Sequence, residues 1–304
     1  MLAPALAVLL VTAMTAAAEL SGEREILFPE IAAVAAGALA APKRPWNTDL
    51  PRLFFSLAAG SVIGTAIVLL IPFPLTVQLC IAFLISSLML LFSRTTFAPM
   101  ISAVVLPVML GTRSYVYPVA AVLLTAAVIG CCLLREPVPY SPEPKPDRRA
   151  LTDLLLRWGL GCFVILFAVK SSQRLIAAPP LLVAYTEFWR PGAAAQRKPL
   201  PFCLMLTGCA ALGALLRYPA VHFGFYQFPA AAVTMLLVLL LMRRTGLWLP
   251  PAAALALLSD LVPAQTLLFY PIQVLAGSLF FTGLAMLHGR INALQRWEER
   301  RARK

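Results

Sequence analysis

The residues best suited to bind a solute in this chain are prolines and polar side chains that recur about 150 positions apart. Pro99 and the pair Pro250-Pro251 open two short apolar segments, where a proline leaves backbone hydrogen-bonding groups without helical partners. A helix that restarts after such a break directs its N–H groups and positive dipole end at a cavity, which suits a small anion. In the alternative interpretation, the prolines only kink packed helices. The candidate substrate-binding residues are Pro99, Pro250, Pro251, Gln78, Gln227, Arg94, Arg244 and Glu30.

Acidic residues inside or beside apolar segments are also candidates for chemistry. Glu30 lies at the start of one short segment, and Glu187 and Asp260 lie near the ends of two others. A carboxylate in hydrocarbon is costly and normally faces a cavity or a cation. All three also lie within a turn or two of an expected membrane surface, so contact with water or headgroups is an equally good interpretation. Asp153 and Arg157, four residues apart, are expected to pair on one helix face.

Enzyme motifs are missing from the sequence. Its two histidines, His222 and His288, are too few and too scattered for a metal or proton-relay site, and none of its six cysteines forms a CxxC pair. It contains no Gly-rich phosphate loop and no nucleophile elbow. The sequence therefore predicts a protein without catalytic activity, cofactor or metal site.

The amino-acid composition indicates whether the chain folds in water or in a lipid bilayer. Apolar residues make up 61% of the chain, against roughly 45–50% in soluble domains. Charged residues make up 12%, against about 25% in soluble domains. Barrel strands would alternate apolar and polar residues, which these runs do not, so helices remain. We expect an all-α polytopic membrane protein. Its net charge of +12 is attributed to the orientation of its loops rather than to binding of nucleic acid.

Apolar runs between charges and prolines delimit twelve segments, each expected to cross all or half of the membrane. The first six are about 2–20, 26–41, 53–71, 74–93, 97–110 and 116–134. The second six are about 152–170, 175–189, 201–216, 224–242, 247–261 and 266–288. The second and fifth segments of each set are short and begin near a proline, so they are expected to cross as tilted or broken helices or to re-enter.

The two sets of segments repeat each other. Pro179 aligns with Pro29 and Arg244-Thr245 with Arg94-Thr95 at an offset of 150 residues, and over all aligned positions the offset varies only from 149 to 153. Because six is an even number, the repeats are expected to be parallel, with any solute site between them. The expected organisation is a membrane repeat over 1–134, a Pro-rich charged linker over 135–150, a second repeat over 151–288 and a basic tail over 289–304 that continues the last helix.

The basic residues predict the orientation. If all twelve segments cross, 20 of the 25 Lys and Arg residues fall on one side and five on the other. This asymmetry predicts a multi-pass protein of the cell (plasma or inner) membrane with both termini in the cytoplasm. Residues 2–18 also resemble a signal-peptide core with small residues at 16–18, but no basic residue precedes them and segment 152–170 supplies a counterpart.

Short motifs in both halves resemble a known family. They read Phe28-Pro29-Glu30-Ile31-Ala32-Ala33, Pro42-Lys43-Arg44-Pro45, Pro51-Arg52, Arg94-Thr95-Thr96-Phe97-Ala98-Pro99 and Tyr117-Pro118 in the first half, and Arg244-Thr245 and Leu249-Pro250-Pro251-Ala252-Ala253-Ala254 in the second. Each half thus resembles one copy of the HPP family of small integral membrane proteins. The family's His-Pro-Pro-Ala motif reads Leu-Pro-Pro-Ala in the second half and, with a weaker match, Phe-Ala-Pro in the first, and both halves lack the histidine. The resemblance implies a tandem copy of that fold and, because some members are implicated in nitrite transport, passage of a small anion.

Three functions fit these observations. The first is a permease or channel for a small solute, such as the anion nitrite, with its site between the repeats. The second is an exporter of amphipathic organic molecules, and the third is a membrane scaffold subunit that transports nothing. The expected partners are the lipid bilayer and the solute, and self-association into a homo-oligomer stays open.

Overall fold

The computed structural model describes residues 2–134 and 139–302, and every regular element in these two ranges is a helix. Linker residues 135–138 and tail residues 303–304 lie outside the described part. The helices before the linker are α1 (Leu2–Ser21), α2 (Glu30–Ala35), α3 (Leu50–Leu70), α4 (Leu75–Phe92), α5 (Pro99–Leu110) and α6 (Val116–Cys132). Those after it are α7 (Arg148–Lys170), α8 (Pro179–Trp189), α9 (Ala194–Arg197), α10 (Pro199–Phe223), α11 (Gln227–Thr245), α12 (Pro250–Leu258) and α13 (Tyr270–Ala302).

The twelve expected segments all coincide with helices, and the second and fifth of each set are short. One π-helical turn, Ala36–Ala40, extends α2, and single 3₁₀ turns precede α2 and α8. The tail continues the last helix, as expected, because α13 runs on to Ala302. Proline at the first or second position starts α3, α5, α8, α10 and α12, where its missing N–H has no helical partner to lose.

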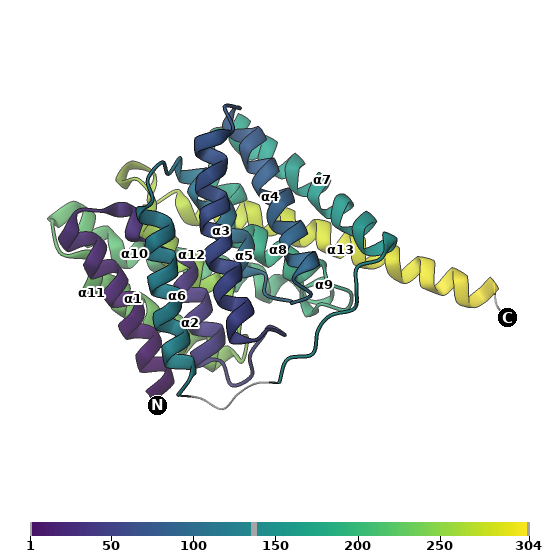
Figure 1. Ribbon diagram of the computed structural model, residues 1–304, viewed down its shortest axis with the longest axis horizontal. Coiled ribbons are helices and arrows are strands. Elements are labelled where there is room, and N and C mark those ends of the chain that lie inside the picture. The colour runs from purple at the N-terminus through teal and green to yellow at the C-terminus, as the bar shows by residue number, and fades with distance from the viewer. Residues whose placement is uncertain (1, 135–138, 303–304) are drawn as a thin grey trace.

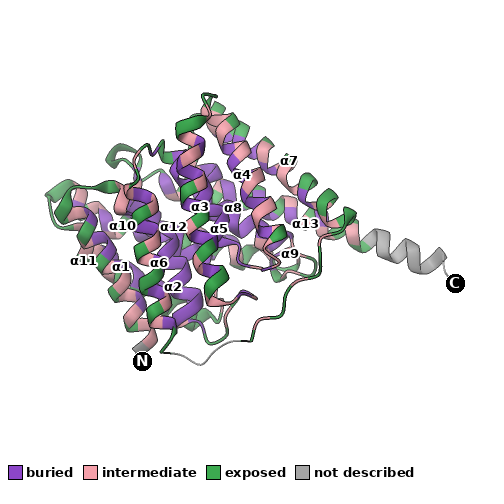
Figure 2. Cartoon of the chain, viewed as in Figure 1, coloured by how far each residue is buried: buried purple, intermediate pink, exposed green. Residues whose placement is uncertain are grey.

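Long apolar helices form the outside of the bundle. Seven helices are long and apolar enough to cross a membrane in the described residues: α1, α3, α4, α7, α10, α11 and α13. Residues on their outer faces are exposed (Figure 2). The exposed residues include the large apolar Phe55, Phe163 and Leu215. Water would penalise these surfaces and lipid would not. The chain therefore has the architecture of a multi-pass helical membrane protein.

The short helices lie at the centre of the bundle. All nine residues of α12 are buried, as are all residues of α5 except Leu110, so these helices meet protein on every side (Figure 2). Glycine lets the outer helices approach them closely. A Cβ added to Gly64 would collide with the backbone oxygen of Val104, and one added to Gly213 with that of Ala256. Close packing of α3 on α5 and of α10 on α12 thus depends on these two glycines.

Segments far apart in the sequence pack side by side. The first helix, α1, packs against α11, and α4 packs against α7 (Figure 1). At the centre, α2 and α8 each contact both α5 and α12. The segments on the two sides of the linker are therefore interlocked, and the four short helices form a ring.

Candidate functional site

A small cavity lies inside this ring of short helices. Its volume is about 10 Å³, and each helix contributes two residues three positions apart. We call it the central cavity. That volume is about the space that one water molecule needs. Its lining residues are Glu30 and Ala33 of α2, Pro99 and Ser102 of α5, Pro180 and Val183 of α8, and Pro251 and Ala254 of α12.

Three helices of this ring, α5, α8 and α12, begin at the central cavity. Pro99 is the first residue of α5, and Pro180 and Pro251 are the second residues of α8 and α12. The free N–H groups of a helix start give it a partial positive charge, and burial strengthens the resulting field. The cavity is therefore a favourable place for negative charge.

Glu30 supplies a carboxyl group at this position. Its side chain is fully buried, and its Oε1 accepts a hydrogen bond from the Ser102 hydroxyl. Its other oxygen, Oε2, is buried without a hydrogen-bond partner. Because an unsatisfied polar atom in the interior is costly, this oxygen marks a position where a proton or a ligand would be stabilised. The interfacial interpretation of Glu30 is thus wrong, since the residue faces a cavity inside the protein.

Three of the eight candidate residues come together here and a fourth lies next to them. Pro99, Pro251 and Glu30 line the cavity, whereas Pro250 packs toward Gly37 just outside it. Ser102 and Pro180 were missed. Their signals were available, because Ser102 lies one helical turn after Pro99 and Pro180 lies 150 residues after Glu30.

The other four candidates lie elsewhere. The Gln78 amide donates to the Ile71 carbonyl at the end of α3, 2.7 Å away, and Gln227 accepts from Arg217 at 3.3 Å. Arg94 contacts the linker, and Arg244 is exposed at the end of α11. The two glutamines occupy equivalent positions in the sequence but have different partners, so they do not form one site.

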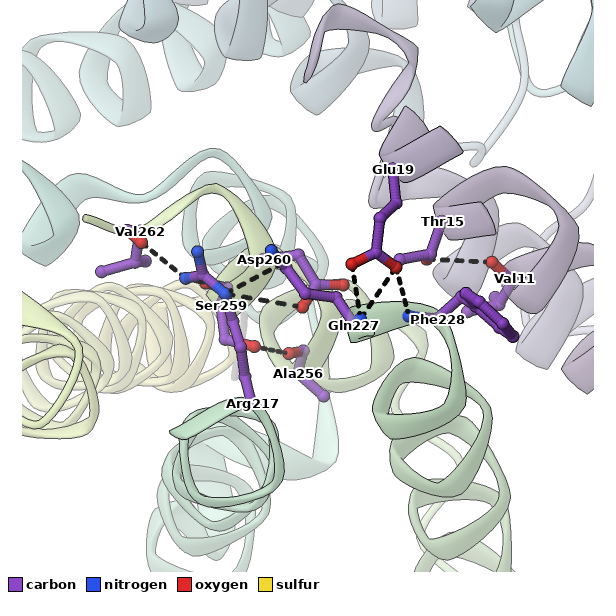
Figure 3. A network of polar contacts seen from close by, with 10 residues as sticks. All are labelled: Val11, Thr15, Glu19, Arg217, Gln227, Phe228, Ala256, Ser259, Asp260 and Val262. Atoms are coloured by element: carbon purple, nitrogen blue, oxygen red, sulfur yellow. Dashed lines mark hydrogen bonds and ion pairs between the residues drawn. The ribbon is translucent and has the colours of Figure 1, made fainter. Parts of the chain in front are cut away.

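A second buried polar network connects α1, α10, α11 and the turn after α12 (Figure 3). The Arg217 guanidinium donates to the carbonyls of Ser259 and Val262, and its Nε lies 4.0 Å from Asp260 Oδ1. The Glu19 carboxylate accepts from the backbone N–H groups of Gln227, at 2.8 Å, and of Phe228, at 3.2 Å. Glu19 thereby caps the first turn of α11 and fixes the contact between α1 and α11.

Further polar contacts join helices and loops at the end of the bundle where the linker lies. The Trp46 indole donates to Glu187 Oε1 at 2.9 Å, and the Arg190 guanidinium donates to the Thr96 carbonyl at 2.6 Å. Burial lowers the pKa of Arg190, and the carboxylates of Glu187 and Glu143 act in the opposite direction. These bonds join the end of α8 to the loops before α3 and α5. The contacts therefore hold the helices and loops together at this end of the bundle.

The expected pairing of Asp153 with Arg157 is wrong. Asp153 accepts two hydrogen bonds from the Trp189 indole, at 3.0 and 3.1 Å, and lies 3.1 Å from His288. Trp189 and His288 stack with ring centroids 3.9 Å apart, so the indole is held in place to donate to the carboxylate. A neighbour on the same helix competes poorly with a donor that tertiary packing holds in place.

Comparisons of the chain with family models, curated proteins and solved structures give no match. Membership of the HPP family therefore stays a prediction that rests on the motif residues.

Proposed function

We propose that this chain is a membrane permease or channel for a small solute that crosses between two parallel six-segment repeats. The lining of the central cavity carries the proposal. Its eight residues form four pairs, one member of each from either side of the linker. The pairs Glu30/Pro180 and Ala33/Val183 are 150 residues apart, and Pro99/Pro251 and Ser102/Ala254 are 152 apart. Lining positions that match in this way are expected of a site on the axis that relates two repeats.

The packing of the helices supports the repeat. Under the same offset, the contact of α1 with α11 corresponds to that of α7 with α4. The contact of α2 with α12 likewise corresponds to that of α8 with α5, and the contact of α3 with α5 to that of α10 with α12. The first two helices of each repeat would thus pack against helices of the other repeat. A solute path would lie between the two repeats at these contacts.

The proposed solute is a small anion such as nitrite. The starts of α5, α8 and α12 favour negative charge at the cavity, and its small volume suits a closed conformation that has to open for passage. An ionised Glu30 would repel an anion here. Passage therefore requires the protonated carboxyl, whose O–H group can donate a hydrogen bond to the anion.

The test is a flux measurement on purified protein in liposomes. Wild-type vesicles are expected to take up nitrite faster than protein-free vesicles, and Pro99→Ala and Pro251→Ala are expected to change the rate. Pro263→Ala, in an exposed turn remote from the cavity, is the matched control and should not change it. Vesicles that stay tight to nitrite and to a panel of other small anions would count against the proposal.

The two other functions have less support. The central cavity, at about 10 Å³, is far smaller than the wide apolar path that an exporter of amphipathic molecules would need between the two repeats. A scaffold subunit would have no use for a buried carboxyl with a free oxygen at the centre of its fold. The buried polar lining from Glu30 and Ser102 therefore favours passage of a small polar solute.

A further inference from the structure

A second, larger cavity lies at the linker end of the bundle. Its volume is about 530 Å³, and its walls come from α4, the start of α7, the end of α8 and linker residues 143–147. We call it the linker-side cavity. It shares no residue with the central cavity, and its volume is in the range of small-molecule sites, far above that of a nitrite ion.

Basic side chains line this cavity and form no salt bridge in the described part of the chain, although nearby carboxylates attract Arg157 and Arg190 electrostatically. The four basic residues are Arg94, Lys145, Arg157 and Arg190. Within the described residues, none of the four lies within 4 Å of a carboxylate oxygen. The Nε of Arg157 is buried and makes no hydrogen bond at all. Such a group is costly in the folded protein unless an acceptor enters the cavity.

Three acidic residues also line the cavity, but each is already engaged. Asp147 caps α7 by accepting from the Ala150 N–H at 2.8 Å, and Asp153 is held by Trp189 and His288. Glu143 Oε1 accepts from the Asn47 amide at 3.2 Å. The carboxylates therefore serve as structural acceptors, and the guanidinium and ammonium groups keep free donors.

The linker is fixed as one wall of the cavity. Arg94 adopts a left-handed backbone conformation with φ of 55°. Its carbonyl accepts from the Glu143 N–H at 2.9 Å and from the Tyr140 hydroxyl at 3.0 Å, and its Nε donates to the Glu143 carbonyl at 2.6 Å. A strained conformation in a non-glycine residue persists only where several contacts determine it. The basic lining is thus assembled before any ligand arrives.

We propose that the linker-side cavity binds the phosphate group of an anionic ligand. Three arginines offer planar forks of donors that match phosphate oxygens, and Lys145 adds a mobile charge. Leucines on α4 and α7, including Leu90 and Leu154, add an apolar part to the wall. A basic pocket between membrane helices at the level of the headgroups is suited to an anionic phospholipid, and the same donors would accept a free phosphate ion.

The experiment measures ligands retained by the full-length protein in nanodiscs. Wild-type protein is reconstituted in phosphatidylcholine with a minor share of phosphatidylglycerol, and native mass spectrometry counts the lipids that stay bound. Phosphatidylglycerol is expected to be enriched over its bulk share. The double variant R157Q/R190Q is expected to lower that enrichment at least about tenfold, because even one lost hydrogen bond to a charged group costs roughly that factor. A second arm adds inorganic phosphate as a competitor.

Matched variants separate binding from folding. Arg149→Gln removes an exposed charge on α7 outside the cavity and should leave the enrichment unchanged. Lys145→Gln changes an exposed linker side chain that no described helix needs, so its loss of enrichment cannot be a folding defect. Competition by inorganic phosphate assigns the site to free phosphate, and enrichment that phosphate does not displace assigns it to the lipid headgroup. No enrichment in wild type, or equal enrichment in all variants, overturns the proposal.

Discussion

Glu30 differs from the other acidic residues in having one oxygen satisfied by Ser102 and the other free in a cavity. Glu187 is held by Trp46, and Asp153 by Trp189 and His288. The Asp260 Oδ2 is also unsatisfied, but the nearby Arg217 gives this residue a cationic neighbour. Glu30 is therefore the acidic residue whose protonation would change the charge of the proposed path most directly.

The first prediction concerns the pH dependence of transport. Nitrite uptake by wild-type vesicles is expected to rise as the pH falls, because protonation removes the negative charge of Glu30 from the cavity. Glu30→Gln keeps the shape of the side chain without its charge, so its uptake is expected to be nearly independent of pH. Protein-free vesicles measured in parallel correct for diffusion of nitrous acid across the lipid.

Glu187→Gln is the matched control for this prediction. Glu187 is an acidic residue at the end of α8 that does not line the central cavity. Its variant should therefore keep the pH dependence of the wild type. Equal pH profiles for the wild type and Glu30→Gln would show that Glu30 does not control the solute path.

Sequence reasoning located the helices well and the site in part. The apolar runs and the prolines at the starts of α5, α8 and α12 are local features, so their positions could be read directly from the sequence. Whether Glu30 faces lipid headgroups or the interior depends on how α2 packs against α5 and α12, which no local pattern encodes. The same limit explains Asp153, whose partners Trp189 and His288 lie 36 and 135 positions further along the chain.

The second prediction concerns the close packing of α10 on α12. Gly213→Ala is expected to destabilise the protein by about 1–3 kcal/mol, because the added methyl group would collide with the backbone of Ala256 and push α10 away from α12. Gly208 lies on the same helix with no atom within 4 Å of its would-be Cβ. Gly208→Ala should instead be neutral or raise stability by up to about 1 kcal/mol.

Thermal unfolding in detergent compares the two variants. The midpoint of Gly213→Ala is expected to fall below that of the wild type, and that of Gly208→Ala to stay level or rise. Equal midpoints for both variants would contradict the close packing of α10 on α12.

At the scale of the whole molecule, the interlocked helices mean that neither side of the linker is a complete bundle. Without α11, the helix α1 would lose its main neighbour, and without α7 the helix α4 would lose its main contact across the linker. Apolar faces that normally meet protein would then face lipid, where helix association has little hydrophobic driving force. We therefore expect the two sides to be stable only together.

A split protein tests this third prediction. The chain is divided between residues 138 and 139. The fragments 1–138 and 139–304 are co-expressed, and one of them is tagged for purification. The untagged fragment is expected to co-purify. Cys80 on α4 and Cys162 on α7 form a side-chain contact, so mild oxidation should join the fragments covalently. Cys80→Ser should prevent the cross-link, whereas Cys203→Ser should not, and fragments that purify separately would refute the interlocked packing.

The pair of Glu30 with Pro180 has an evolutionary consequence under the proposed repeat. An assembly of two identical chains places every residue twice about its axis, so an acid at this position would face its own copy across a space of about 10 Å³. Two carboxylates at such close range cannot both ionise. Fusion of the copies into one gene lets the two positions diverge. The fused chain can therefore hold a single carboxyl group at its centre, whereas two identical chains would hold either none or two.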